Sequence, residues 1–210
     1  MSIFSDTTKK MMKAMDIKNI HAVPRITKVI VSVGVGKLRD VKGHIEAVEK
    51  DLALITGQKP QQRLARKAVA GFAVRAGNIV GYKATLRGKR MEDFVERFVN
   101  ITLPRVRDFR GLSLKGLDGQ GNLSVGVSEH LAFPEIHPDK TDIIFGVEAT
   151  FVTSATSDAQ AEQLFRALGF PFKSTEQMEE EDVQVETAGS RAAKAQQRLA
   201  AQKTTTPVAE

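Results

Sequence analysis

Forty consecutive residues, 52–91, contain nine basic side chains and no acidic one. Within this interval, residues 79–87 alternate between apolar and polar types. The apolar residues are Tyr82, Ala84 and Leu86, and the polar ones are Lys83, Thr85 and Arg87. Because successive side chains of a β-strand point to opposite faces, this stretch predicts a strand with one apolar and one cationic face. Like charges at this density oppose folding unless a polyanion neutralises them, so we expect the rest of the chain to leave the cationic face open.

Other stretches of the chain also predict strands. The run "ITKVIVSV", residues 26–33, is rich in β-branched residues, and 122–128 and 142–153 are similar. In the first run one face should carry Thr27, Val29, Val31 and Val33, and the other Lys28, Ile30 and Ser32. The basic interval itself predicts two or three strands around glycine turns. Gly77-Asn78 suits either a hairpin tip or a longer, mobile loop.

Four segments have the 3.6-residue period of amphipathic helices: 5–16, 41–55, 91–106 and the segment after Ser157. Gly57 and Gly169 stand where C-terminal caps belong, and Ser157 with Gln160 forms a capping box. The third helix should bury Phe94, Phe98 and Ile101, and Pro104 should disturb its end. The glycine-rich segment 107–122 is typical of a long loop.

This order of elements favours an α+β fold, because strands that arrive in consecutive groups tend to form an antiparallel sheet. We expect helices on one face of the sheet and, on the other, an open cationic face that binds a polyanion such as RNA. The predicted domain spans 1–173. Residues 174–210 have an acidic part and a part rich in alanine and glutamine, and they predict a disordered C-terminal extension.

The charge of the chain is unevenly distributed. The formal net charge is +6, but residues 1–173 hold 27 bases and 18 acids, a balance of +9. A polyanionic partner is therefore expected. The chain has no cysteine, and we find no apolar signal segment or stretch long enough to span a bilayer. These features predict a cytoplasmic protein without a membrane partner.

A glycine turn after the first strand, Gly34-Val35-Gly36-Lys37, invites comparison with nucleotide-binding loops. A P-loop needs a glycine where Val31 stands and a serine or threonine where Leu38 stands. The dinucleotide fingerprint needs a third glycine at Arg39. The four histidines are scattered, without metal-ligand spacing. We therefore predict no catalytic residue, no metal and no cofactor.

Several long motifs resemble one family. They are "ITGQKPQQRLARKAVAGFAVRAG", "GYKATLRGKRM", "LPRVRDFRGL" and "DGQGNLSVGVSEHLAFPEI". Together, from about Val23 to Phe172, they resemble bacterial large-subunit ribosomal protein number five, the 5S rRNA-binding family uL5. The resemblance implies a structural constituent of the large ribosomal subunit that helps to attach 5S rRNA in the central protuberance. The implied partners are 5S rRNA, 23S rRNA, P-site tRNA, neighbouring large-subunit proteins and, across the subunit interface, a small-subunit head protein.

The resemblance also implies site residues. Those expected to bind rRNA are Arg25, Lys28, Ser32, Gln58, Lys59, Thr85 and Arg87. Those expected to bind tRNA are Lys67, Gly71, Phe72, Arg75, Gly77 and Asn78, in the loop 67–78. Ser32 departs from the asparagine typical of the family, and a serine hydroxyl cannot make the bidentate contact of an amide. The loops around 108–121 and 134–142 are expected to form the intersubunit bridge.

Some alternatives remain open at this stage. Phe72 and Tyr82 suit either a place in the core or stacking on a base or sugar. An enzyme that uses the Gly34–Lys37 turn and an RNA-binding regulator outside the ribosome are the competing functions. An ATP titration compared with retention on 5S rRNA would separate the first from a ribosomal role. Co-sedimentation with large subunits would separate the second.

Overall fold

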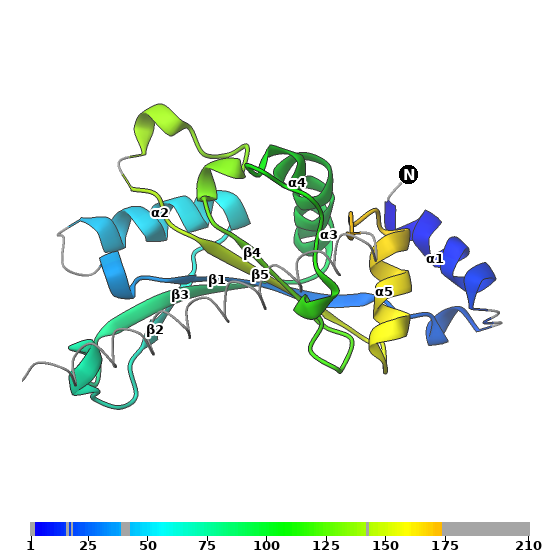
Figure 1. The fold of residues 1–210 in the computed structure, drawn as a ribbon, viewed down its shortest axis with the longest axis horizontal. Coiled ribbons are helices and arrows are strands. Elements are labelled where there is room, and N and C mark those ends of the chain that lie inside the picture. The colour runs from blue at the N-terminus through cyan, green and yellow to red at the C-terminus, as the bar shows by residue number, and fades with distance from the viewer. Residues whose placement is uncertain (1–2, 16, 18, 39–42, 142, 174–210) are drawn as a thin grey trace, which may run out of the picture. The chain divides into compact units, whose positions relative to one another are not determined.

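The computed structural model describes residues 3–15, 17, 19–38, 43–141 and 143–173 (Figure 1). Its strands are β1 (Ile26–Gly34), β2 (Gln61–Leu64), β3 (Ile79–Leu86), β4 (Leu123–Val127) and β5 (Val147–Thr153). Its α-helices are α1 (Ile3–Ala14), α2 (His44–Thr56), α3 (Lys89–Arg97), α4 (Leu103–Arg105) and α5 (Asp158–Ala167). A π-helical turn, Phe98–Thr102, joins α3 to α4. Among the described residues, no helix is long and apolar enough to cross a bilayer.

The five strands form one sheet in the order β2-β3-β1-β5-β4, and every neighbouring pair is antiparallel. Helices α2 and α3 lie over the same side of this sheet, and α1 and α5 lie beside each other (Figure 1). The predicted α+β fold with one covered face is therefore confirmed. The predicted C-terminal extension lies outside the described residues, so the division at 173 remains a prediction.

The covered face carries the core. Val29, Val31 and Leu86 have no exposed surface, and aromatic side chains from the helices and β5 pack on them. Phe98 lies at the centre of the aromatic group, with its ring centroid 5.3 Å from that of Phe151. Burying a side chain of this size stabilises the fold by about 1.5–3 kcal/mol. The core therefore fixes which sheet face is turned away from solvent.

The structure corrects the predicted position of Thr27. The pairing of β1 with β5 shifts register between Ile26 and Lys28, so the strand has a local irregularity there. Ile26 is buried and Thr27 is exposed, with its hydroxyl donating to the Val152 carbonyl at 3.0 Å. The alternation of side chains between the two faces breaks at this point because Thr27 has no partner residue in the β1–β5 ladder.

The third helix also differs from its prediction. The Leu103 N–H donates to the Phe98 carbonyl, a bond five residues back that widens the helix by one residue per turn. Thr102 is consequently fully buried, and Ile101, which was predicted to face the core, is 40% exposed. Pro104 follows this turn and has no N–H to donate, so the expected disturbance at the helix end is confirmed.

Four smaller expectations are resolved by the structure. Gly57 and Gly169 follow α2 and α5 with positive φ, as C-caps do. The Ser157 side chain makes no capping bond, and the Gln160 side chain accepts from the backbone of Thr156 instead. Strand β5 begins at Val147, later than predicted. The segment 107–122 is mostly irregular, with a single 3-10 turn and isolated bridges.

Candidate nucleic-acid interface

The uncovered side of the sheet, called here the open face, follows directly from the strand register. One row of paired residues runs across all five strands: Gln61, Lys83, Ser32, Glu148 and Gly126. The next row contains Thr85, Ile30, Thr150 and Ser124. Lys28 and Arg63 point to the same side, and every residue of both rows is exposed or half-buried. The open face is thus polar, and it carries cations from β1, β2 and β3.

Of the residues predicted to bind rRNA, the structure gathers Lys28, Ser32 and Thr85 on the open face. Gln58 comes next to them, because its side-chain amide donates to the Thr85 carbonyl at 3.1 Å. That bond ties the turn after α2 to β3. It occupies one of the two N–H donors of the Gln58 amide and leaves the other donor and the amide oxygen for a partner.

The other three predicted cations lie at the ends of strands. Arg25 precedes β1, and its backbone exchanges hydrogen bonds with Ser154. Arg87 follows β3 and is exposed. The Lys59 side chain is 86% exposed, with its ammonium 3.7 Å from the Glu49 carboxylate. An exposed pair at this distance contributes little to stability, so Lys59 is available to an anionic partner.

The segment between β2 and β3 is a long loop without a further strand. Its base is closed by bonds from the Ala65 N–H to the Asn78 carbonyl and from the Gly77 N–H to the Ala65 carbonyl. Gly77 has a φ of 88°, which favours glycine. Of the two predicted forms, the structure has the longer loop in place of a hairpin tip at Gly77-Asn78.

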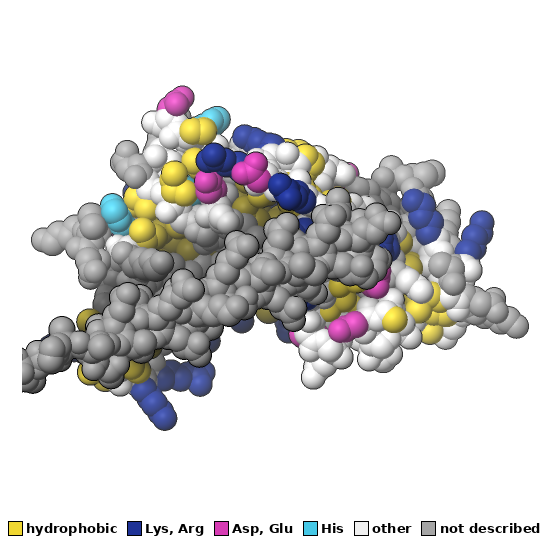
Figure 2. Space-filling view, viewed as in Figure 1, with side chains coloured by type: hydrophobic (Ala, Val, Ile, Leu, Met, Phe, Trp, Pro, Cys, Tyr) yellow, Lys and Arg dark blue, Asp and Glu magenta, His cyan; other side chains and the backbone are white. Residues whose placement is uncertain are grey.

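The loop presents aromatic and basic side chains together. Phe72 is 78% exposed, so the alternative that it belongs to the core is wrong. Lys67 and Arg75 are also exposed, as are the glycines predicted to bind tRNA, Gly71 and Gly77. Figure 2 shows basic and apolar side chains side by side at the lower left, where Figure 1 places the β2–β3 hairpin.

Tyr82 takes the opposite alternative. It is 2% exposed, and burial together with the neighbouring Glu49 carboxylate raises its pKa to about 12. The alternative in which Tyr82 stacks on a base is therefore wrong.

The glycine turn after β1 forms a short 3-10 turn, Gly36–Leu38, with the Val35 N–H bonded to the Val80 carbonyl. In the described part of the chain, no cluster of three or more histidine, aspartate or glutamate residues could hold a metal ion.

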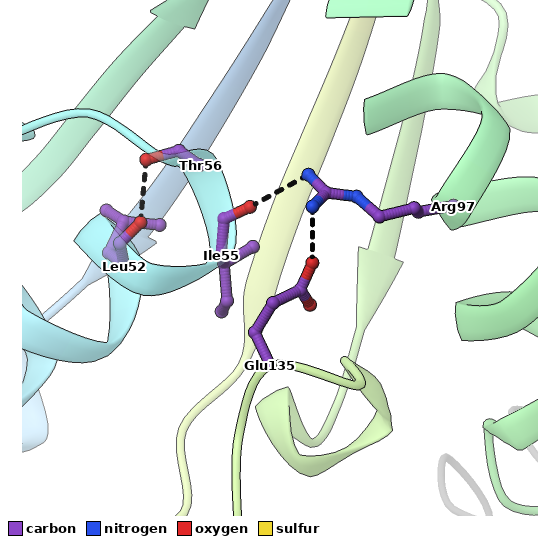
Figure 3. Close-up of polar contacts among 5 residues, drawn as sticks. All are labelled: Leu52, Ile55, Thr56, Arg97 and Glu135. Carbon is purple, nitrogen blue, oxygen red and sulfur yellow. Dashed lines mark hydrogen bonds and ion pairs between the residues drawn. The ribbon is translucent and has the colours of Figure 1, made fainter. Parts of the chain in front are cut away.

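Polar contacts fix the loop 129–141 against the helices. The Arg97 guanidinium lies 2.8 Å from the Glu135 carboxylate and donates to the Ile55 carbonyl at 3.5 Å (Figure 3). His130 is fully buried, with its Nε2 atom 3.5 Å from Oδ2 of Asp51. Sequence reasoning missed these contacts, because the partners lie far apart along the chain.

Sequence reasoning also missed Glu148. It stands opposite Ser32, whose hydroxyl donates to its Oε2 atom at 3.2 Å. Glu148 is the only carboxylate among the open-face strand residues that the structure describes. In the sequence, the apolar residues Val147, Ala149 and Phe151 alternate with polar ones. That alternation would have placed Glu148 on the open face.

Comparison with known proteins agrees with the architecture. Residues 19–75 match the family described as "Ribosomal protein L5", and residues 79–172 match the model of the C-terminus of the same ribosomal family. The large ribosomal subunit protein uL5 of Halothermothrix orenii is 50% identical over 163 residues, which cover 78% of this chain and 91% of that protein.

Two other relatives carry the same name. The uL5 protein of Carboxydothermus hydrogenoformans is 48% identical over 168 residues, 80% of this chain and 94% of that protein. That of Prochlorococcus marinus is 49% identical over 166 residues, 79% of this chain and 93% of that protein.

The fold, the polar open face and these matches define a structural protein of the large ribosomal subunit, and not an enzyme. The chain belongs to the ribosomal protein L5 family. The predicted family and the predicted location, the cytoplasmic ribosome, are confirmed through these relatives.

Proposed function

We propose that the open face binds 5S rRNA and that the protein helps to attach this RNA, together with 23S rRNA, in the central protuberance. The exposed loop 67–78 contacts P-site tRNA. The loops 108–121 and 134–142 face a head protein of the small subunit, although Asp142 lies outside the described residues. Neighbouring large-subunit proteins complete the set of partners.

One observation carries the 5S rRNA proposal. A five-stranded sheet has helices on one face, and its other face presents Lys28, Arg63 and Lys83 among polar side chains. Phosphate contacts from such side chains supply affinity and position the RNA without reading its sequence. Ser32, Gln58 and Thr85 add hydroxyl and amide groups that can meet riboses and bases.

Charge reversal on the open face and at the end of β3 tests this proposal. Lys28→Glu combined with Arg87→Glu is expected to weaken 5S rRNA binding by more than tenfold, because cation–phosphate contacts are replaced by repulsion. The control is Lys10→Glu with Lys50→Glu, two exposed helical lysines whose reversal changes the net charge equally. Filter binding measures affinity, and circular dichroism checks folding. Equal losses of affinity in both double variants would show that the effect depends on net charge alone. That result would overturn the assignment of the open face to 5S rRNA binding.

The salt dependence of wild-type binding gives an independent measure. The slope of log K against log salt reports how many phosphates are neutralised. We expect the open-face double variant to have a shallower slope than the control. Retention of the chain on large subunits after a high-salt wash would support a ribosomal role, and release with free 5S rRNA would favour a regulator outside the ribosome.

The tRNA contact requires a separate test. Phe72→Ala with Arg75→Ala removes one stacking group and one cation from the exposed loop. We expect unchanged 5S rRNA binding and weaker P-site tRNA binding by reconstituted ribosomes, since base stacking and phosphate contacts are lost. Leu54→Ala with Lys50→Ala, on the exposed side of α2, is the matched control. Loss of 5S rRNA binding would assign the loop to the wrong RNA.

A further inference from the structure

A carboxylate on a surface that binds RNA is unfavourable unless hydrogen-bond donors meet it. Glu148 is exposed on the open face, in one row with Lys83 and Ser32. Phosphates repel it, and covering it with RNA removes its water. Its position within a cationic surface therefore needs a specific partner.

The surface around Glu148 is hollow because glycines surround it. The hollow is shallow, with a volume of about 350 Å³. The residues of its lining that matter here are Ser32, Gly34, Gly126, Ser128, Gly146 and Glu148. A Cβ atom added to Gly34 or Gly126 would have no neighbouring atom within 4 Å, so both glycines leave open space beside the carboxylate. Side-chain-free backbone allows a flat group to approach the sheet closely.

The carboxylate in this hollow is oriented by a neighbour. Ser32 stands directly opposite Glu148 in the β1–β5 ladder and donates its hydroxyl hydrogen to Oε2. An ionised carboxylate has about four acceptor sites on its two oxygens, so one serine bond leaves room for two further donors. The two carboxylate oxygens of Glu148, oriented by Ser32, can therefore accept hydrogen bonds from a group with two N–H donors.

We propose that this hollow receives an unpaired guanine base of the bound RNA, with its N1–H and N2–H groups donating to the Glu148 carboxylate. Guanine is the base with two neighbouring N–H donors on its Watson–Crick edge. Adenine and cytosine place a ring-nitrogen acceptor beside their amino group, and uracil offers a single N–H between two carbonyls. Single-stranded RNA is commonly recognised through such edges of unstacked bases.

The spacing of the open face suits a nucleotide. Lys83 lies on β3 and Glu148 on β5, two strands apart in the sheet order, which is about 10 Å. A nucleotide whose phosphate contacts the cations of β3 or β1 can therefore extend its base to the hollow. Glu148 becomes a specificity-determining residue on a surface whose lysines and arginines supply affinity. This inference rests on the proposed binding of 5S rRNA by the open face.

The sign of one substitution tests the inference. Glu148→Gln keeps the side-chain length and removes a negative charge from a surface that binds a polyanion. If charge alone matters, the variant binds 5S rRNA more tightly. If the carboxylate accepts from guanine, the variant presents an N–H group to an N–H donor, and binding weakens by about tenfold. The salt slope should stay unchanged, because no phosphate contact is lost.

Three controls sharpen this experiment. Glu96→Gln, on the exposed side of α3, removes the same charge away from the open face and should not weaken binding. Gly126→Val fills the hollow without a charge change and, like Glu148→Gln, should weaken binding while the melting temperature is maintained. Replacing single unpaired guanosines of 5S rRNA by inosine, which lacks N2–H, should weaken the wild type at one position and have little further effect on Glu148→Gln.

The outcomes separate the two proposals. Wild-type binding to 5S rRNA in the same titration tests the proposed function, and a failure there overturns both. Tight wild-type binding, with Glu148→Gln binding equally well or better, overturns the guanine site alone and favours a basic protein group as the partner of Glu148. The absence of an inosine position coupled to Glu148 would likewise reject guanine.

Discussion

His130 and Phe145 stack their rings with centroids 3.9 Å apart and planes 10° from parallel. Their backbones are also joined, because the His130 N–H donates to the Phe145 carbonyl at 3.0 Å. The Phe145 N–H points at Nδ1 of His130, at 3.4 Å. Because Nδ1 accepts, the proton of the neutral ring is assigned to Nε2, facing Asp51. The start of the loop 129–141 is therefore anchored to the segment before β5.

The charge state of His130 follows from competing effects. Burial lowers the pKa of His130 below its ordinary 6.5, while the nearby Asp51 carboxylate opposes this shift. Burial likewise raises the pKa of Asp51, against the influence of His130. Although the two side chains lie within ion-pair distance, both directions favour the uncharged forms. At 3.5 Å the contact is too long to offset the loss of hydration, so we consider His130 neutral.

The first prediction is that the stability of the fold decreases as the pH falls below about 6.5. A depressed folded-state pKa means that the unfolded chain binds the proton first, so the contribution of neutral His130 is present above 6.5 and lost toward acid. Asp51 has the opposite sign and returns some stability at lower pH. Urea midpoints measured at about pH 7.5 and pH 5 check this dependence. His130→Gln should flatten the dependence, and His137→Gln, at an exposed loop position, should preserve it.

The second prediction concerns Arg97, which joins α3 to the loop 129–141 and to the end of α2. Arg97→Ala should lower the free energy of unfolding by about 1–2 kcal/mol, because the half-buried Glu135 carboxylate loses its partner. Glu162→Ala is the matched control, since its pair with Arg166 has the same 2.8 Å distance but lies on the surface of one helix. Its expected cost is about 0.3–0.5 kcal/mol. Equal costs would show that burial adds nothing to the Arg97 contact.

Much of the fold could be predicted because its signals are local. The alternation in 82–86 assigned each residue to the correct face, and Gly57 marked the end of α2. The irregularity at Thr27 could not be predicted in the same way. It arises where β1 pairs with β5, more than a hundred residues later, and a period of two along one strand carries no information on that pairing.

The candidate site was likewise predictable only where its signals are local. The alternation in β1 and β3 placed Lys28, Ser32 and Thr85 on one face. The pairing of Glu148 with Ser32, however, depends on the strand order. The exposure of Phe72 depended on whether the basic interval folds as a short hairpin or as a long loop, and the glycines of that interval allow both.

The third prediction compares two buried threonines whose hydroxyl groups differ in hydrogen bonding. Thr102 in the π-helical turn is fully buried, and its hydroxyl has no hydrogen-bond partner among the residues that the structure describes. Thr102→Val should therefore maintain the stability or raise it by about 1 kcal/mol. Thr56, 3% exposed, donates to the Leu52 carbonyl at 2.7 Å (Figure 3). Thr56→Val should cost about 1 kcal/mol, and denaturant unfolding of both variants checks the difference in sign.

The fourth prediction concerns two glycines that face each other in the β1–β3 ladder. A Cβ atom on Gly81 would lie 2.6 Å from the Val33 carbonyl oxygen, which is backbone and cannot rotate away. Gly81→Ala should therefore force β1 and β3 apart at this end and cost about 2 kcal/mol. A Cβ atom on its partner Gly34 would meet nothing within 4 Å. Gly34→Ala should be tolerated, with a gain of up to about 0.5 kcal/mol from the less flexible unfolded chain. Urea unfolding of the two variants measures the difference, and similar stabilities would mean that the strands do not approach this closely.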